Sequence, residues 1–515
     1  MRTSGIRCAA WCLALVVLTV VTRLPLLQLN QPIDDEVVYG VAAQTILDGG
    51  VPYINAVERK PPLLFYVYAA VLTAFGSDNW RALHAVEVVW ILATMAALVV
   101  IGRTLFDTHT GLIAAMLYGI FQSWSYWNNL AFNGEVLMNL PLAWAFAIAL
   151  SGGTSRRLIS LFMAGGLIAV AFLLKQPAAI AIVPLALFIL GPLAVTRKGY
   201  ARVFAELALL VFGFSVVLVT MTAWLFTRGL LGEAFYWTIT NHAVPEIFWG
   251  RAIRNTLAFV AFCAPITIGA WLSVRDPEIW NGRQAERTTF AALLTVSVIG
   301  AASSGRFYPH YYIAAVLPCA LLAAPWLTRL WRSGGRERHL SQVTQAWLAA
   351  TVLIFFAAHV RGLSRQPTVS DAGRYLAMHS TQDDRIFVWG QATRIYVDAH
   401  RRPASRYIAT FPLTGLIFGA PKAAPGEKKP DTHARIVPGA WSHLRADFAQ
   451  HQPKYIVDTE AAPEASYPVS DFPALLELLA NEYEVVAQTS EGVIYRWDRQ
   501  KALTAAYTSG IERLD

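Results

Sequence analysis

Residues 207–226, LALLVFGFSVVLVTMTAWLF, decide the class of fold. This stretch holds no charged residue, and about 20 apolar residues suffice for an α-helix to cross a bilayer. Similar runs recur along the chain, which has 515 residues, 55% of them hydrophobic and only 15% charged. Soluble proteins carry about 25% charged residues, so this chain lacks the charge that a water-exposed surface needs. The sequence therefore predicts a polytopic α-helical membrane protein.

About eleven apolar runs are candidates for membrane-spanning helices. They begin near Cys8, His84, Gly111, Glu135, Leu158, Ala178, Val203, Asn255, Thr288, Tyr311 and Val343. Every second loop is basic, with Arg103, Arg156, Arg275 and Arg329 as examples. Because basic loops stay in the cytoplasm, we expect a cytoplasmic N-terminus and a multi-pass protein of the cytoplasmic (inner) membrane. The first run is long and lacks a small-residue cleavage site, so we expect a retained helix and not a signal peptide.

The composition also argues against other classes of protein. The formal net charge of +8 comes from Lys and Arg in short loops, so it indicates membrane orientation and not a nucleic-acid partner. The four cysteines lie inside or at the edge of apolar runs. Their spacing predicts neither disulfides nor a zinc site, and the sequence predicts no metal and no cofactor.

The basic loops fall on one side of the membrane only if one of the apolar stretches does not cross it. Residues 61–76, PPLLFYVYAAVLTAFG, are short for a span and rich in aromatic residues, which favours the membrane interface. We therefore expect residues 30–82 to form one long outer loop that contains interfacial helices. If the stretch crossed, the basic loops between it and the C-terminal part would lie outside.

From about residue 362 the chain becomes more charged and loses its long apolar runs. Strand-like segments at 385–389, 454–458, 483–488 and 493–497 alternate with helical stretches at 371–379 and 472–481, which predicts a soluble α/β domain. We expect residues 1–360 to form a transmembrane catalytic domain and residues 361–515 an extracytoplasmic domain.

Three groups of polar residues on the predicted outer face could carry chemistry. The first is IDDEVVY, with Asp34, Asp35, Glu36 and Tyr39. Charged residues at a membrane helix are costly unless solvated or used, and a carboxylate here could act as a general base on an attacking hydroxyl or amine. A solvated acidic loop is at least as common an explanation for these residues taken alone.

The second group is ERKPP, where Lys60 precedes Pro61 and Pro62. Because proline suits the start of a helix, Lys60 would be fixed at the membrane surface, where it could meet a phosphate. Ordinary snorkelling of a lysine to the interface is the better explanation for an isolated residue.

The third group, RFYPHYY, brings a cation, an imidazole and phenols together at the entry of a late span. Arginine suits phosphate binding, but an aromatic belt also explains the tyrosines, though not the histidine. Its candidate residues are Arg306, Tyr308, His310 and Tyr311. Glu135 and Lys175, at the outer ends of two spans, are weaker candidates, because each alone is more often a helix-end residue.

Taken together, these motifs resemble the GT-C glycosyltransferases, in the bacterial branch related to protein O-mannosyltransferases and the lipid A aminoarabinose transferase. The resemblance covers residues 1–360. It rests on an Asp-Glu pair with a following Tyr, on a Lys-Pro element, on a second outer acid, on a Lys-x-Pro element, and on Arg-x-Tyr-x-His-Tyr-Tyr. In this chain these are Asp35, Glu36, Tyr39, Lys60, Pro61, Glu135, Lys175, Pro177, Arg306, Tyr308, His310, Tyr311 and Tyr312.

The resemblance implies transfer of a sugar from a polyprenyl phosphate donor to an acceptor outside the membrane: lipid A, a glycan, a lipid or a protein. It implies catalytic roles for Asp35, as base, and for Glu36 and Glu135, as helpers. The residues implied in binding the lipid phosphate and the sugar are Tyr39, Lys60, Lys175, Arg306, Tyr308, His310 and Tyr311. Fixed cations would stabilise the leaving phosphate.

Two other functions compete with this one. A transporter or flippase for lipid-linked sugars would also have many spans, but it should carry charge or broken helices at the midplane. A sensor or assembly protein would leave Asp35, Lys60 and Arg306 without a role.

Overall fold

The computed structural model describes residues 2–124, 127–153, 156–195, 199–241, 247–333, 337–365, 369–416, 431–459 and 467–511. The chain forms two compact units. Unit 1 comprises Met1–Glu36 and Arg59–Gln366, and unit 2 comprises Val37–Glu58 and Pro367–Asp515. The sequence placed a domain boundary after residue 360 but gave no reason to assign residues 37–58 to the C-terminal part.

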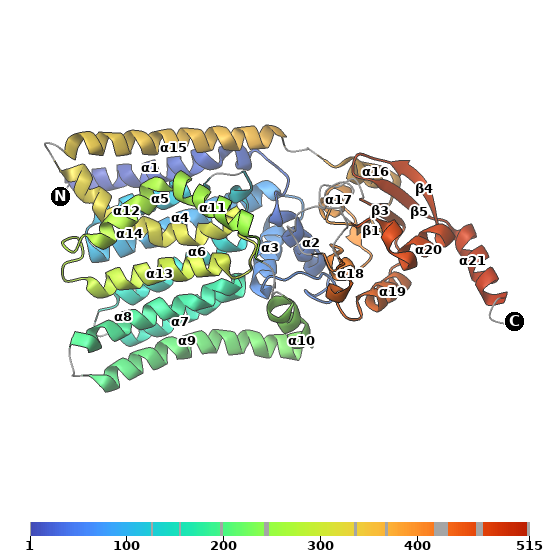
Figure 1. Cartoon of the computed structure of the whole chain (residues 1–515), viewed down its shortest axis with the longest axis horizontal. Helices are drawn as coiled ribbons and strands as arrows, with labels where there is room; N and C mark the ends of the chain where they lie inside the picture. Colours follow the sequence, from blue (N-terminus) through green and yellow to red (C-terminus); the bar gives the residue numbers. More distant parts are fainter. Residues whose placement is uncertain are drawn as a thin grey trace. The chain divides into compact units, whose positions relative to one another are not determined.

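Unit 1 is a bundle of helices packed side by side (Figure 1). Its long helices are α1 (Arg2–Leu27), α4 (Trp80–Leu105), α5 (Thr108–Phe121), α6 (Gly134–Ser151), α7 (Arg157–Leu174), α8 (Ile182–Val195), α9 (Tyr200–Thr227), α11 (Trp249–Phe262), α12 (Ala264–Arg275), α13 (Gln284–Ala302), α14 (Ile313–Arg332) and α15 (Glu337–Arg365). The shorter ones are α3 (Pro62–Phe75) and α10 (Leu231–Phe235). Helix α2 (Asp35–Leu47) begins in unit 1 and continues into unit 2.

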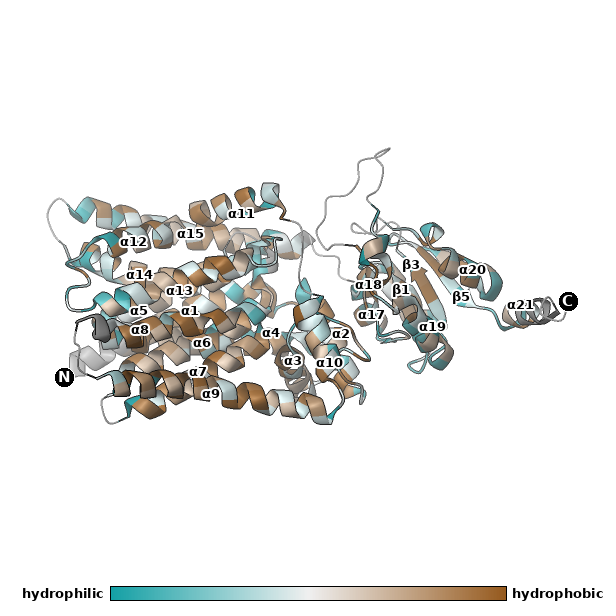
Figure 2. Cartoon of the chain, turned by 60° about the horizontal axis from the view of Figure 1, so that its bottom comes forward, coloured by the Kyte–Doolittle hydropathy of each residue, from teal (hydrophilic) through white to brown (hydrophobic). Residues whose placement is uncertain are grey.

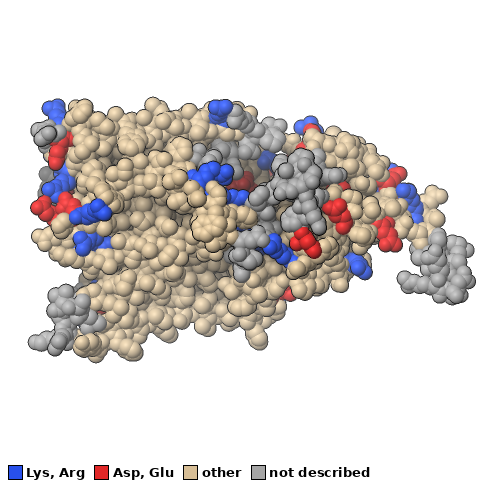
Figure 3. All heavy atoms as spheres, in the orientation of Figure 1, with Lys and Arg blue, Asp and Glu red and all other residues tan. Residues whose placement is uncertain are grey.

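Helices occupy all eleven places where the sequence predicts spans. Of the described helices, seven are long and apolar enough to cross a membrane, or eight if α11 and α12, bent by 82°, count as one span. Apolar residues run along the length of the bundle (Figure 2). The face drawn in Figure 3 carries few charged side chains between the two ends of the bundle. These features indicate a multi-pass membrane protein. They do not establish all eleven of the predicted spans.

Local sequence signals set the helix starts. The side chains of Asn79, Asp107 and Asn133 accept hydrogen bonds from backbone N–H groups at the starts of α4, α5 and α6. Such caps satisfy donors that the first turn of a helix leaves unpaired. Pro62 begins α3, where a missing N–H costs nothing.

Helices α7 and α9 approach so closely that only glycine fits at their crossing. A Cβ atom at Gly165 would collide with the carbonyl oxygen of Leu210, and one at Gly213 would collide with that of Phe162. Small residues at such crossings are the usual means of close helix packing in membranes.

We expect Gly165→Ala to destabilise the protein, because the two backbones must move apart to admit the methyl group. Overpacking of this kind costs about 1–3 kcal/mol. Thermal unfolding in nanodiscs measures the effect, and Gly166→Ala is the matched control. A Cβ at Gly166 meets its nearest atom, in Val217, at 3.5 Å, an ordinary contact. Equal melting temperatures for the two variants would contradict the close crossing.

The end of the bundle opposite the outer motifs is basic and is held by ion pairs. Arg332 pairs with Asp107 at 2.8 Å and Arg329 with Asp276 at 2.9 Å. Arg157 pairs with Glu206, also at 2.8 Å. These pairs join loops that the sequence places on one side of the membrane.

Unit 2 is built on a five-stranded sheet with the strand order β2-β1-β3-β5-β4. Its strands are β1 (Arg385–Trp389), β2 (Arg402–Pro403), β3 (Tyr455–Asp458), β4 (Tyr483–Gln488) and β5 (Val493–Trp497). Strands β2, β1 and β3 are parallel, whereas β5 runs antiparallel to β3 and β4. Its helices are α16 (Asp371–His379), α17 (Arg394–Ala399), α18 (Phe411–Thr414), α19 (Ala440–Gln450), α20 (Pro473–Glu482) and α21 (Arg499–Ile511).

The four strands expected from the sequence lie where they were predicted, and β2 was missed because it is only two residues long. The core lies between the sheet and the helices, with Ile386, Phe387 and Ile456 fully buried. The segment 37–58 packs into this unit. Its Val57 donates a backbone hydrogen bond of 2.8 Å to the carbonyl of Arg406.

Candidate active site

Loops from four separate parts of unit 1 meet at one end of the bundle. They follow α1 and α7 and precede α6 and α14. Each contributes at least one residue that the sequence singles out: Asp35, Lys175, Glu135 and His310 respectively. The bundle topology therefore brings together residues that lie up to 275 positions apart in the sequence.

Asp35, the first residue of α2, faces His310. One carboxylate oxygen of Asp35 lies 3.9 Å from Nε2 of the histidine. The Asp35 side chain is 32% exposed, whereas that of His310 is 11% exposed. A solvent-accessible carboxylate beside an imidazole is suited to accept a proton from an incoming group.

Glu135 and Lys175 form a buried ion pair beside the same histidine. The Lys175 Nζ lies 2.8 Å from one carboxylate oxygen of Glu135, and the two side chains are 9% and 3% exposed. The ammonium also lies 4.9 Å from the centre of the Tyr311 ring. The second oxygen of Glu135 is buried and has no hydrogen-bond partner among the described residues. It can therefore accept a hydrogen bond from a bound molecule.

Lys60 joins this group from the loop before α3. The charges of Glu135, Asp35, Lys175 and Lys60 all act on the His310 ring through space. The Lys60 loop is fixed by Gln176, which donates from its side-chain amide to the carbonyl of Arg59 at 2.7 Å. Gln176 follows Lys175 in the sequence, and Arg59 precedes Lys60. The hydrogen bond between Gln176 and Arg59 therefore holds together the two loops that carry these lysines.

The Arg306–Tyr311 segment is held by the start of α11. Asn255 donates to the carbonyl of Phe307 at 2.7 Å, and Arg251 donates to that of Arg306 at 3.3 Å. The Arg251 guanidinium also lies 4.8 Å from the centre of the Tyr308 ring. Arg306 itself is buried, with 6% of its surface exposed.

The backbone is strained on both sides of this site. Asp34 has a φ of 47° and Phe307 a φ of 49°. For residues other than glycine these values lie in the sparsely populated left-handed region, and such strain persists where the surrounding structure imposes it. Each of the two residues precedes a candidate by one position, Asp35 and Tyr308.

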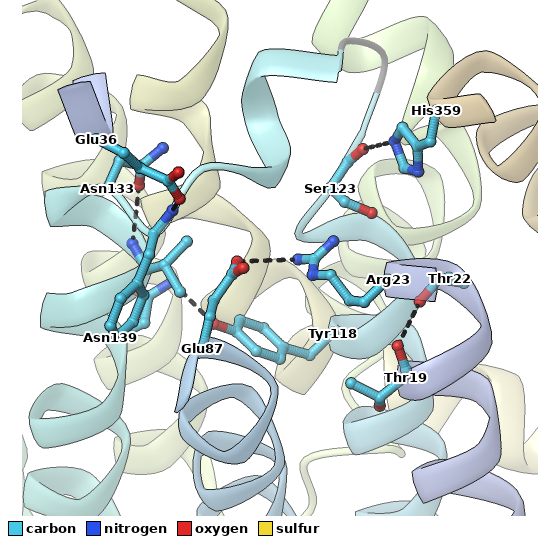
Figure 4. Close-up of polar contacts among 12 residues, drawn as sticks. Thr19, Thr22, Arg23, Glu36, Glu87, Tyr118, Ser123, Asn133, Asn139 and His359 are labelled. Atoms are coloured by element: carbon cyan, nitrogen blue, oxygen red, sulfur yellow. Dashed lines mark hydrogen bonds and ion pairs between the residues drawn. The ribbon is translucent and has the colours of Figure 1, made fainter. Parts of the chain in front are cut away.

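Glu36 differs from its neighbour Asp35 in being fully buried. Its two oxygens accept hydrogen bonds from the backbone N–H groups of Ile33 (2.9 Å) and Phe132 (2.8 Å), and one of them lies 3.2 Å from Nε2 of His84. Figure 4 shows the Glu36 carboxylate directed into the bundle, on the side of Asn133. This carboxylate ties the loop after α1 to the loop before α6.

Polar groups continue inward from Glu36. Arg23 of α1 lies 3.6 Å from Glu87 of α4, and both side chains are fully buried. Asn139 of α6 donates to the hydroxyl of Tyr118 of α5 at 3.3 Å (Figure 4). These groups link the helices beneath the candidate site.

We expect Glu36→Gln to lower stability more than Asp34→Asn. The amide that replaces one carboxylate oxygen cannot accept a hydrogen bond, so a buried backbone donor loses its partner. An unsatisfied buried group costs about 1–3 kcal/mol. Thermal unfolding in nanodiscs tests this, with Asp34→Asn as the control because Asp34 is exposed and Asn tolerates a left-handed φ. A Glu36→Gln protein with the wild-type melting temperature would contradict the structural role.

A pocket opens from the ion pair along apolar side chains. Glu135, Lys175 and Tyr311 line its polar end, and Leu142, Ile180, Leu293 and Val296 are among the residues that line the rest. Its cavity volume is about 40 Å³, so it is a narrow passage that leads from polar to apolar side chains.

The structure brings most of the predicted residues together and separates two of them. Asp35, Glu135, Lys175 and His310 are in one cluster with Lys60, Tyr308 and Tyr311. Glu36 points away, and Tyr39 belongs to unit 2. Among described residues, no group of three or more His, Cys, Asp or Glu side chains has a metal-binding arrangement.

Sequence reasoning missed the residues that hold this site in place. They are His84, Gln176, Arg251 and Asn255. Gln176 had a usable signal, because it adjoins Lys175 within the Lys-Gln-Pro element. The other three lie on helices far away in the sequence. Arg251 and Asn255 bond to backbone carbonyls and His84 contacts the Glu36 carboxylate, and no motif reveals such partners.

Comparisons with known proteins agree with this architecture. Residues 59–224 match the family described as dolichyl-phosphate-mannose-protein mannosyltransferase. A search of curated proteins gives no match. The fold is similar to that of ArnT from Cupriavidus metallidurans in the apo state, with a TM-score of 0.62 at 13% identity over 97% of this chain and 99% of that one.

Two further solved structures are similar. ArnT from the same organism bound to undecaprenyl phosphate gives a TM-score of 0.56 at 14% identity, over 96% and 99% of the two chains. The oligosaccharyltransferase of Archaeoglobus fulgidus in the apo form gives 0.54 at 14% identity, over 96% of this chain and 74% of that one. The predicted resemblance to the GT-C glycosyltransferases is confirmed at the level of fold.

Proposed function

We propose that this protein is a membrane glycosyltransferase that moves a sugar from a polyprenyl phosphate to an acceptor on the outer side of the cytoplasmic membrane. The acceptor is lipid A, another glycan, a lipid or a protein. One observation carries the proposal: a solvent-accessible carboxylate, Asp35, lies beside a buried cationic group, Lys175, at the polar end of an apolar pocket. The match to a mannosyltransferase family and the structural likeness to ArnT support it.

In the proposed reaction the acceptor hydroxyl or amine attacks the anomeric carbon of the donor sugar. Asp35 takes the acceptor proton as the new bond forms. The bond between the sugar and the phosphate breaks, and its electron pair leaves with the polyprenyl phosphate. Direct displacement of this kind inverts the anomeric carbon.

The leaving phosphate gains negative charge, and fixed cations at its position stabilise that charge. Lys175 and Lys60 are placed for this role because Gln176 joins their loops. His310 lies between these cations and Asp35. Arg306 and the phenols of Tyr308 and Tyr311 complete the binding set, and Glu135 orients Lys175 and presents its second oxygen to the sugar.

Glu36 acts as a positioning residue in this scheme. Its oxygens are occupied by the backbone of two loops and by His84. It therefore fixes Asp35 relative to Glu135 and does not itself contact the sugar. Tyr39 lies one helical turn after Asp35 on α2 and is buried, so this scheme gives it no contact with the sugar.

We propose a topology of eleven spans with a cytoplasmic N-terminus, with α3 lying at the outer interface. Basic ion-paired loops gather at one end of unit 1, and the candidate site lies at the other. The positive-inside rule then puts the basic end in the cytoplasm. Residues 361–515 would form an extracytoplasmic domain.

The test is donor turnover by the purified full chain. The protein in nanodiscs is incubated with a panel of polyprenyl-phosphate sugars and a membrane extract as acceptor, and mass spectrometry follows release of the polyprenyl phosphate. The proposal is supported if polyprenyl phosphate is released only when an acceptor is present and Asp35 is intact. Movement of an intact lipid-linked sugar across the bilayer, without cleavage, would instead identify a flippase.

A further inference from the structure

A second pocket lies entirely within unit 2 and shares no residue with the candidate active site. Its volume is about 310 Å³, within the usual range of small-molecule sites. Three arginines and a histidine line it, together with two aspartates and several uncharged polar residues. They include Thr45, Asp48, Asn55, Arg385, Arg402, Ser405, Arg406, Asp447, Gln450 and His451.

Two of the arginines are fixed by aspartates. Arg402 pairs with Asp48 through two nitrogens, at 2.9 and 3.1 Å. Arg406 pairs with Asp447 through two nitrogens, at 2.8 and 3.1 Å. Bidentate pairs of this kind hold a guanidinium in a defined orientation. They form the rigid frame of the pocket.

Arg385 has a different environment. It is the first residue of β1 and stands in register with Arg402, the first residue of the parallel strand β2. Neighbouring strands lie about 4.8 Å apart, and like charges side by side on a sheet repel each other. Arg385 donates a 3.0 Å hydrogen bond from Nη1 to the carbonyl of Pro403. Among the described residues, no carboxylate lies within ion-pair distance of it.

The pocket therefore carries uncompensated positive charge. Burial, with Arg402 beside it, lowers the pKa of the Arg385 guanidinium. Burial, with Arg385 beside it, likewise lowers the pKa of His451. In both groups the neighbouring guanidinium adds to the effect of burial, and an anion beside Arg385 would offset that repulsion.

We propose that this pocket binds a phosphorylated sugar, with the phosphate on Arg385 and the sugar hydroxyls on the surrounding polar side chains. A guanidinium fork matches two phosphate oxygens. Asn55 and Gln450 supply amide groups for hydroxyls, and the volume admits more than a phosphate alone. A sugar phosphate that is free in solution and the head group of a glycolipid present the same chemistry to this pocket, and the experiment distinguishes them.

The experiment uses the full chain in nanodiscs of zwitterionic lipid, with isothermal titration calorimetry. The soluble probe is glucose 1-phosphate, with glucose as its uncharged counterpart. The lipid probe is monophosphoryl lipid A in micelles. We expect one of the two phosphorylated probes to bind one site per chain, glucose to fail, and Arg385→Gln to weaken binding about 10-fold or more, because a charge-assisted contact is lost.

Two control variants distinguish a specific loss of binding from unfolding of the protein. Arg385→Lys keeps the charge without the fork and should weaken binding less than Arg385→Gln. Arg374→Gln removes an exposed arginine of the same unit that does not line the pocket, and should bind like the wild type. Binding of the soluble probe identifies a free sugar phosphate, and binding of the micelles alone identifies a glycolipid. Failure of both probes, or equal affinity of Arg385→Gln and wild type, overturns the proposal.

Discussion

The Asp35→Asn protein is expected to transfer sugar about 10³-fold more slowly than the wild type while folding normally. A general base in the reacting position contributes roughly 10²–10⁴-fold, and the amide cannot take the acceptor proton. Because the Asp35 side chain is partly exposed and the amide has nearly the same shape, we expect the fold to tolerate the replacement. The measurement is release of polyprenyl phosphate under saturating donor, together with a melting curve of each protein.

Asp34→Asn is the matched control for this prediction. It removes the neighbouring carboxylate, which is exposed, and Asn accepts the left-handed φ of 47° at that position. Its activity should stay within about twofold of the wild type, since surface substitutions away from special features have small effects. Equal losses in the two variants would show that the loop needs negative charge in general and that Asp35 is not the base.

The Lys175→Met protein is expected to lose both stability and activity. Its partner Glu135 is 3% exposed, so the substitution leaves a buried charge without compensation. Breaking a buried pair in this way costs about 3–5 kcal/mol. The same substitution removes a cation from the polar end of the apolar pocket, so donor turnover should fall as well.

The double variant Lys175→Met/Glu135→Gln separates these two effects. Without the orphaned carboxylate the melting temperature should recover most of its loss, whereas donor turnover should stay low because the cation is still missing. Arg329→Met removes one partner of an exposed pair at the other end of the bundle and should change stability by about 1 kcal/mol at most. Recovery of activity together with stability would mean that Lys175 serves only the fold.

Most of the site residues could be predicted because polar and charged side chains are unusual next to membrane-spanning helices. A charged residue at the end of an apolar run is costly, which is why Asp35, Glu135 and Lys175 were visible in the sequence. The structure then joins them through contacts of 2.8 to 3.9 Å. No periodicity or spacing could indicate these contacts, since they depend on which loops of the bundle are neighbours.

Two adjacent acidic residues show what could not be predicted from the sequence. Asp35 and Glu36 look equivalent in the motif, but consecutive helical residues project about 100° apart. One therefore opens to solvent near His310, and the other turns inward to His84 and two backbone donors. The proposed division into a base and a positioning residue rests on this difference.

The sequence by itself determined the membrane class, the places of the long helices and four of the five strands. These features depend on local hydrophobic periodicity and on capping residues, which act within a few positions of the chain. The tertiary structure decided the membership of residues 37–58 in unit 2, the burial of Glu36 and the meeting of Arg385 with Arg402. Each of these depends on contacts between segments far apart in the sequence, and their energies are fixed only once the whole chain has packed.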